Sequence, residues 1–287
     1  MSETAQNFRI GGPSIYGYHD YRGYLRDLLA HAKKKQPEYS LRSLAKQAGV
    51  SAPYLSVVLS GNKNLSGKIM EELLKILDLN DDEKSYFRLL RTIADSDDAE
   101  ERHQALDQLQ RFRRYRRLNP RETEIYRYLT KWYYVAIREL ATLPDFKMEP
   151  KWIQERLCYP LSQNEIMKAL RFLVKYHFIE PKEDGTVEVP DKRMECWAGV
   201  FRVALGQFYR QIYGLASQSI ETIPREERHI IGDTLAIPAG SFEEFKALLD
   251  ESLRKISALG NAKENPDSIY HFSFLGFPIA KGRKESA

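Results

Sequence analysis

Residues that commonly begin helices alternate with glycines that commonly end them between Ser40 and Lys68 (SLRSLAKQAGVSAPYLSVVLSGNKNLSGK). Ser40 and Ser51 each precede a segment with helical periodicity, where a hydroxyl can accept hydrogen bonds from free backbone N–H groups. Gly49 and Gly61 follow these segments, where a chain that leaves a helix commonly takes a positive φ. This pattern predicts two short helices joined by a tight turn.

The small and apolar residues of the stretch have the spacing that two crossed helices require. Ala45 leaves space where the second helix crosses the first, and Val50, Leu55 and Val58 return the chain to the core. With these residues, the stretch resembles the repressor/Cro-type helix-turn-helix family over about 55 residues. The matching elements are Leu44-Ala45, Gly49-Val50-Ser51, Leu55-Ser56, Ser60-Gly61 and the loop Asn62-Lys63-Asn64. One position departs from the family, because many relatives have Gln where this chain has Leu41.

The resemblance implies binding to double-stranded DNA, with the second helix in the major groove. The residues expected to face base edges are Ala52, Pro53, Ser56 and Val57. Those expected to face phosphates are Arg42, Ser51, Tyr54, Asn62, Lys63, Asn64 and Lys68. The base-facing set has no Arg, Lys, Gln or Asn, so it cannot make the usual bidentate contacts to guanine or adenine. Contacts to thymine methyl groups, bridging waters and DNA shape remain available.

Charge is distributed unevenly along the chain. Residues 17–68 hold nine Lys and Arg against three Asp and Glu, whereas residues 69–110 hold five against twelve. A local excess of positive charge favours contact with a polyanion. The basic residues of the first block are Arg22, Arg26, Lys33, Lys34, Lys35, Arg42, Lys46, Lys63 and Lys68.

Helical periodicity on both sides of the motif predicts a mainly α, multidomain chain. The expected helices of the N-terminal part are His19 to Lys35, Ser40 to Ala48, Ser51 to Ser60, Ser66 to Leu77 and Asp81 to Ile93. They form a five-helix DNA-binding domain over residues 16–94, in which the last four helices begin with a capping Ser or Asp. Residues 95–120 are expected to form a helical connector, with a helix over Asp95 to Gln110.

A short basic run follows that helix, and two interpretations stay open for it. Its arginines are Arg111, Arg113, Arg114, Arg116 and Arg117. Arginines interleaved with Phe112 and Tyr115 suit a second contact to DNA. Alternatively, the two aromatic rings are buried in an interdomain helix and the arginines pair with the acidic segment before it.

Residues 121–192 follow the order of a winged helix-turn-helix. We expect helices at Arg121 to Leu143, Lys151 to Leu157 and Ser162 to Tyr176, and strands at Phe178 to Pro181 and Val187 to Val189. A capping box of Ser162 and Glu165 opens the third helix. The polar side of that helix serves either DNA or protein contact, and it carries Gln163, Asn164, Lys168 and Arg171.

Residues 193–280 are expected to form a small α+β unit for dimerisation or sensing. Its predicted elements are a helix over Trp197 to Glu221, a strand over Arg228 to Ile237, a helix over Ser241 to Leu259 with a Ser241 and Glu244 capping box, and a strand over Tyr270 to Ile279.

The whole chain also resembles a bacterial family that joins an N-terminal helix-turn-helix to a long C-terminal region of unknown function. The matching pieces are Tyr21-Arg22-x-Tyr24-Leu25, the loop Leu59 to Ser66, Thr234-Leu235 and Tyr270 to Phe277. This resemblance implies a bacterial transcription regulator, but no ligand. We expect a homodimer on DNA, with a small-molecule or protein effector unidentified.

Signals for other classes of protein are weak in this sequence. It contains no phosphate-binding loop, dinucleotide fingerprint, HExxH or GxSxG motif, so we expect no enzyme and no cofactor. The six histidines have no metal-binding spacing. Cys158 and Cys196 indicate reduced structural thiols, with a redox sensor as the alternative. The chain has no apolar run long enough to span a bilayer and no leader peptide pattern, so we expect a cytoplasmic protein without a membrane contact.

Two other functions remain open. One is a protein-interaction adaptor that keeps the helix-turn-helix fold without binding DNA. The other is an enzyme with a site in the C-terminal α+β unit, for which a deep pocket with converging titratable groups would be the sign.

Overall fold

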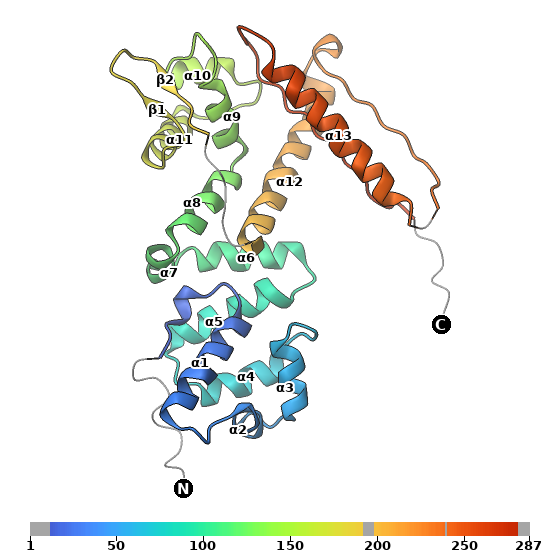
Figure 1. The fold of residues 1–287 in the computed structure, drawn as a ribbon. Helices are drawn as coiled ribbons and strands as arrows, with labels where there is room; N and C mark the ends of the chain where they lie inside the picture. The colour runs from blue at the N-terminus through green and yellow to red at the C-terminus, as the bar shows by residue number, and fades with distance from the viewer. Residues whose placement is uncertain (1–11, 192–197, 239, 281–287) are drawn as a thin grey trace. The chain divides into compact units, whose positions relative to one another are not determined.

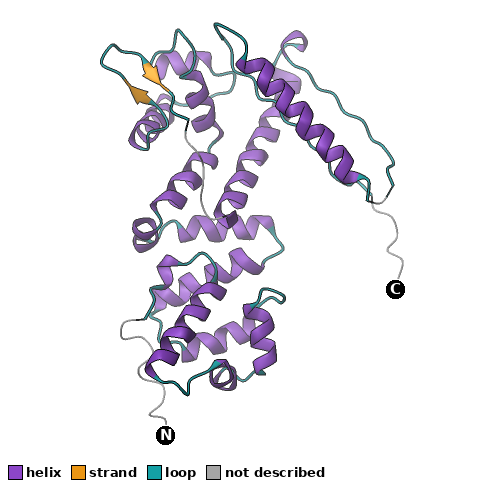
Figure 2. Ribbon diagram, viewed as in Figure 1, coloured by secondary structure: helices purple, strands orange, loops and turns teal. Residues whose placement is uncertain are grey.

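The structure, a computed structural model, describes residues 12–191, 198–238 and 240–280, and it is mainly helical (Figure 1 and Figure 2). The chain divides into two compact units: Met1–Trp132 with Arg193–Ile212, and Tyr133–Lys192 with Tyr213–Ala287. Within the described ranges, no helix has both the length and the apolar character that a membrane crossing needs.

The first unit is entirely helical in its described part. Its elements are η1 (Ile15–Gly17), α1 (Tyr21–Lys35), α2 (Leu41–Gln47), α3 (Ala52–Leu59), α4 (Gly67–Ile76), α5 (Asp81–Asp95), α6 (Ala99–Leu109), α7 (Arg113–Leu118), α8 (Pro120–Leu129) and the first part of α12 (Ala198–Thr222). Aromatic residues fill much of the core, including the fully buried rings of Tyr21, Tyr24, Tyr86, Phe87 and Tyr115.

Local capping signals determined most helix starts in this unit. The hydroxyls of Ser40, Ser51 and Ser66 accept hydrogen bonds from the third backbone N–H beyond them, as predicted. The expected cap of α5 was wrong by one residue. Asn80 caps that helix in a reciprocal capping box with Glu83, so Asp81 is the first helical residue.

The single helix expected between Arg121 and Leu143 is wrong, because the chain forms α8 and then α9 (Trp132–Leu140). A distant side chain bridges the break between them. Gln211 Nε2 donates to the carbonyl of Thr130 at 2.9 Å, and Gln211 Oε1 accepts from the backbone N–H of Trp132 at 3.2 Å. This amide satisfies backbone groups that a continuous helix would have paired internally.

The second unit contains α9, α10 (Pro150–Arg156), α11 (Gln163–Lys175) and a small hairpin. Its strands β1 (Glu180–Pro181) and β2 (Val187–Glu188) pair antiparallel, and Gly185 in their turn has φ +84°. The predicted capping box at the start of α11 is confirmed, because Ser162 and Glu165 bond reciprocally. α12 continues from the first unit into this one, and η2 (Arg225–Glu227) and α13 (Phe242–Asn261) follow it.

The small α+β unit expected over residues 193–280 is not formed by the described residues. No strand occurs at Arg228 to Ile237 or at Tyr270 to Ile279, since neither run has a described strand to pair with. The predicted capping box of α13 is also absent, because Ser241 has a helical backbone and its hydroxyl donates to the carbonyl of Pro238. Trp197, the expected first residue of α12, and Cys196 lie outside the described residues.

Candidate nucleic-acid interface

α2 and α3 are joined by a turn that only a few residue types can form. Gly49 takes φ +68°, and the backbone N–H of Val50 returns to the carbonyl of Ala45 at 2.9 Å. An L side chain is strained at that φ, so glycine allows the tight connection. On the inner side, Leu44, Ala45 and Leu55 are buried. α3 is thereby held against the core along one side only.

The outer side of α3 presents the predicted base-facing residues to solvent. Pro53, Ser56 and Val57 are exposed, with Val57 at 42%, and Ala52 is half-buried. Short side chains on a helix let its backbone approach a partner surface closely. Only Ser56 among them offers a side-chain hydrogen bond.

The loop that follows α3, residues 60–66, carries several of the predicted phosphate-facing residues. Gly61 takes φ +85°, and Asn62 donates its backbone N–H to the carbonyl of Val57 at 3.1 Å. The Lys63 ammonium lies 5.1 Å from the centre of the Tyr54 ring. The Tyr54 hydroxyl accepts from the backbone N–H of Ser66 at 3.5 Å, at the start of α4.

The predicted phosphate-facing residues differ in how accessible they are. Arg42, Ser51, Asn62, Lys63 and Lys68 are exposed on α2, α3, the loop and α4, and Tyr54 is half-buried. Asn64 is different in one respect. Its amide Nδ2 donates to the carbonyl of Asp95 at 3.0 Å, so this group holds the loop to α5.

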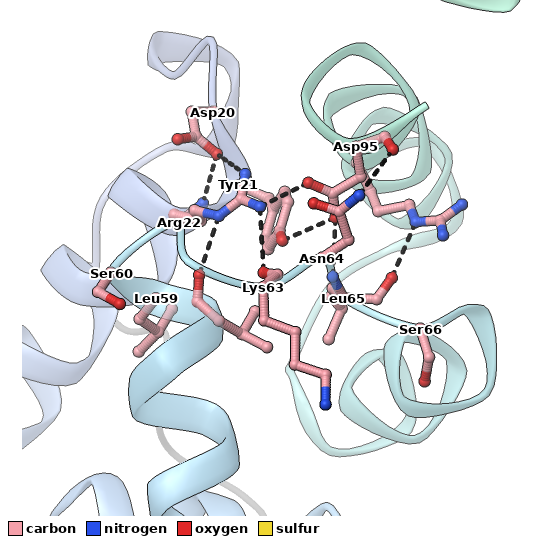
Figure 3. A network of polar contacts seen from close by, with 12 residues as sticks. Asp20, Tyr21, Arg22, Leu59, Ser60, Lys63, Asn64, Leu65, Ser66 and Asp95 are labelled. Carbon is pink, nitrogen blue, oxygen red and sulfur yellow. Dashed lines mark hydrogen bonds and ion pairs between the residues drawn. The ribbon is translucent and has the colours of Figure 1, made fainter. Parts of the chain in front are cut away.

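A buried ion pair lies directly behind this loop (Figure 3). Arg22 Nη2 donates to Asp95 Oδ1 at 2.5 Å, and the two side chains are 9% and 0% exposed. The carboxylate also accepts from the Tyr21 hydroxyl at 2.9 Å and from the backbone N–H of Leu65 at 2.8 Å. Three donors from two separate segments therefore meet on one carboxylate at the end of α5.

The guanidinium of Arg22 reaches α3 from the other side of the pair. Its Nε donates to the carbonyl of Val58 at 2.9 Å, and its Nη2 donates to the carbonyl of Lys63 at 3.4 Å. Arg26 adds a second bond from α1, from Nη1 to the carbonyl of Leu59 at 2.6 Å. Two of these bonds reach carbonyls in the last turn of α3, where the helix itself supplies no further N–H groups; the Val58 carbonyl also accepts from the backbone N–H of Gly61 at 3.0 Å.

Electrostatics in this network favour the charged arginine. Burial alone would lower the pKa of Arg22, but Tyr21, Asp95 and Asp20 outweigh it and raise that pKa above its ordinary value. Burial, with the neighbouring Asp95 carboxylate, also raises the pKa of Tyr21, which therefore stays a hydrogen-bond donor. The network is a fixed set of donors and acceptors at neutral pH.

The prediction for two residues of the expected basic surface is therefore wrong. Arg22 and Arg26 were expected to contact phosphates, but both donate to backbone carbonyls near the end of α3, and Arg22 is buried. The sequence analysis did not predict a role for Asp95, because it is one of several acidic residues near a predicted helix boundary. No local spacing could have paired it with an arginine 73 residues away.

The basic run at α7 makes several contacts within the chain, as its structural interpretation expected. Arg111 pairs with Asp107 of α6 at 3.0 Å, and Arg116 donates to the carbonyls of Gln110 and Arg111. The guanidinium of Arg114 lies 5.6 Å from the centre of the Tyr16 ring. The other two arginines of the run, Arg113 and Arg117, are exposed. α7 is thus partly occupied by structural contacts, and its buried anchor is Tyr115.

The described ranges contain no cluster of three or more His, Cys, Asp or Glu with the geometry of a metal site. An open hollow of about 500 Å³ lies in the second unit, beside the start of α11. Its titratable lining groups are the side chains of Cys158, Tyr159 and Glu165, and Glu165 is engaged with the Ser162 hydroxyl at 2.6 Å.

Comparison with known proteins gives one match. Residues 109–279 match the model of a family described as a domain of unknown function (DUF4423). Neither the curated proteins nor the solved structures include a match to the chain. The matched segment covers more than half of the chain and includes α7 to α13, so this protein belongs to the DUF4423 family.

Proposed function

We propose that this protein is a sequence-specific DNA-binding transcription regulator that uses α2 and α3 as a helix-turn-helix. The observation that carries the proposal is the combination of an exposed short-chain face on α3 with cations around it. Pro53, Ser56 and Val57 form the face, and Arg42 and Lys63 lie exposed on the neighbouring helix and loop. Such a helix can enter the major groove while its neighbours reach the phosphates.

The buried pair of Arg22 and Asp95 supports this proposal through geometry. It attaches the end of α3 to α1 and the following loop to α5, so the recognition helix and the loop are held as one piece. Preorganised donors lose less entropy on binding than mobile ones. The role of the pair is therefore to position the DNA-contacting elements, without touching DNA.

In this proposal the regulator is a bacterial, cytoplasmic homodimer. Two copies place their α3 helices in successive major grooves, about 34 Å apart, on a near-palindromic site. The winged-helix-like part, residues 121–192, and the remaining C-terminal region set dimerisation or respond to an effector. Arg113 and Arg117 of α7 are exposed and take no part in the contacts described above, so they are the remaining candidates for a second DNA contact.

Selection from random duplexes tests the proposal. Purified full-length protein is mixed with the pool at two salt concentrations, and the recovered DNA is sequenced. We expect an enriched inverted repeat. Three exposed cations in each copy, Arg42, Lys63 and Lys68, predict that the logarithm of affinity falls with that of salt at a slope of about −5 for the dimer.

Charge reversal gives a matched comparison in the same assay. Lys63→Glu with Lys68→Glu should abolish nearly all DNA affinity. Lys147→Glu with Lys151→Glu makes the same change of charge on exposed lysines of the second unit and should leave affinity within about two-fold. Absence of both enrichment and salt-sensitive binding would contradict the proposal.

A second candidate function, a protein-interaction adaptor, is favoured by one observation. The exposed face of α3 lacks the long polar side chains that usually read bases, and Val57 and Pro53 suit an apolar partner. The lysine reversals separate the two functions. An adaptor keeps its protein partner when Lys63 and Lys68 become Glu, whereas a DNA-binding regulator loses its target.

A further inference from the structure

The C-terminal part of the second unit is a single layer with no core of its own. α13 is flanked by two extended segments, residues 228–238 and 264–280, and we call these three elements the C-terminal arm (Figure 1). The tail passes against the N-terminal half of α13, since a Cβ on Gly276 would lie 3.3 Å from the Phe242 ring and 3.8 Å from Leu249. α13 itself contains no buried residue.

Large apolar side chains are exposed throughout the arm. They are Ile230, Ile231, Leu235, Ile237, Phe242, Phe245, Leu248, Leu253, Leu259, Ile269, Tyr270, Phe272, Phe274, Leu275, Phe277 and Ile279. Their exposed fractions run from 37% at Phe245 to 80% at Ile231. With side chains of roughly 150–200 Å² each, on the order of 1,500 Å² of apolar surface faces water. The largest apolar patch of a monomeric protein is usually about 300–600 Å².

Most of the backbone of the two extended segments lacks a backbone partner. Residues 229–237, 264–270 and 272–280 make no backbone-to-backbone hydrogen bond to any other described residue. Their side chains still alternate as in strands, most clearly at Tyr270, Phe272 and Phe274. Unpaired extended backbone with apolar side chains is a template for strand addition. The two extended segments of the arm therefore have the backbone and side-chain pattern of β-strands but no partner strands within the described residues.

The charges of the arm identify the kind of partner. Near the start of its helix, Glu243 pairs with Lys246 at 2.7 Å, and in the second half Lys255 pairs with Glu251 at 2.7 Å. Glu244 and Arg254 have no such partner on the helix, and an antiparallel copy of the same helix would bring Glu244 of one beside Arg254 of the other. The arm as a whole has seven acidic residues against four Lys and Arg, which disfavours a nucleic acid or an anionic membrane as the partner.

We propose that the C-terminal arm pairs with the C-terminal arm of a second copy of this chain. The two helices and four extended segments together form two layers around a shared apolar core, through an interface related by a two-fold axis. The exposed apolar area exceeds the ~800 Å² that each partner contributes to a stable interface. This inference supplies the surface for the homodimer of the proposed function, on which it rests for its biological role.

The mass of full-length protein in solution, without DNA, tests the pairing. At about 10 μM, a concentration at which an interface of this size is normally formed, we expect light scattering to give twice the chain mass of 33.4 kDa. Ile231→Asp with Phe277→Asp, one change in each extended segment, should yield a monomer and weaken association at least 100-fold. Both residues are exposed in the single chain, so the monomeric variant should keep its helical content in circular dichroism.

A control double variant places the same charges outside the arm. Met148→Asp with Met167→Asp alters exposed methionines of the second unit and should leave the dimer intact. A monomeric wild-type chain, or a dimer that withstands the change at Ile231 and Phe277, would overturn the inference. A dimer that fails to select any DNA would instead overturn the proposed function and leave the arm pairing standing.

Discussion

Replacing Asp95 with alanine is expected to destabilise the first unit more than any surface change. The substitution removes the acceptor of three hydrogen bonds and leaves the Arg22 guanidinium buried without its counter-ion. Removing one partner of a buried pair costs about 3–5 kcal/mol. At roughly 2–4 °C per kcal/mol for a unit of this size, the thermal midpoint should fall by about 6–20 °C. DNA affinity should fall as well, because the backbone N–H of Leu65 loses the carboxylate that holds it to α5.

Circular dichroism during heating measures this effect, and two further variants make it specific. Asp97→Ala, at an exposed acid two residues away, should change stability by less than about 0.5 kcal/mol. Arg22→Met added to Asp95→Ala should cost less than the sum of the single changes, since the unpaired charge is then gone. If Asp95→Ala melts with the Asp97→Ala control, the argument that this pair anchors α3 and its loop is refuted.

Three further predictions concern local features. Ser162→Ala should lower stability by about 1 kcal/mol in urea unfolding because it removes a formed cap, while Ser241→Ala, which caps nothing, should stay within about 0.5 kcal/mol. Gly49→Ala should cost about 1–2 kcal/mol by the same measurement, and Gly49→Asn less, because φ is +68° and no atom crowds the site. Burial lowers the pKa of His19 below its ordinary 6.5, although the Glu122 carboxylate acts in the opposite direction. As the pH falls, the unfolded chain therefore binds a proton at this histidine before the folded chain does, and the free energy of unfolding decreases below about pH 6.5. His19→Phe should flatten that decline in melts between pH 7 and 5, and an unchanged slope would refute the assignment.

The sequence by itself determined the features that depend on residues close together in the chain. Caps at Ser40, Ser51 and Ser162 and the glycine at position 49 were predicted correctly. A capping hydrogen bond or a positive φ involves atoms within three or four residues, so the information lies in the local sequence. The mainly helical character of the chain follows from the same kind of signal.

Only the tertiary structure decided the features that depend on a distant partner. From its charge alone, Arg22 was predicted to contact phosphate. In the structure it pairs instead with Asp95, which lies 73 residues away in the sequence. The break after Thr130 depends on the amide of Gln211. The apolar runs before and after α13 have the alternation of strands, yet a strand exists only when a neighbour accepts its backbone hydrogen bonds, and within the described chain none does.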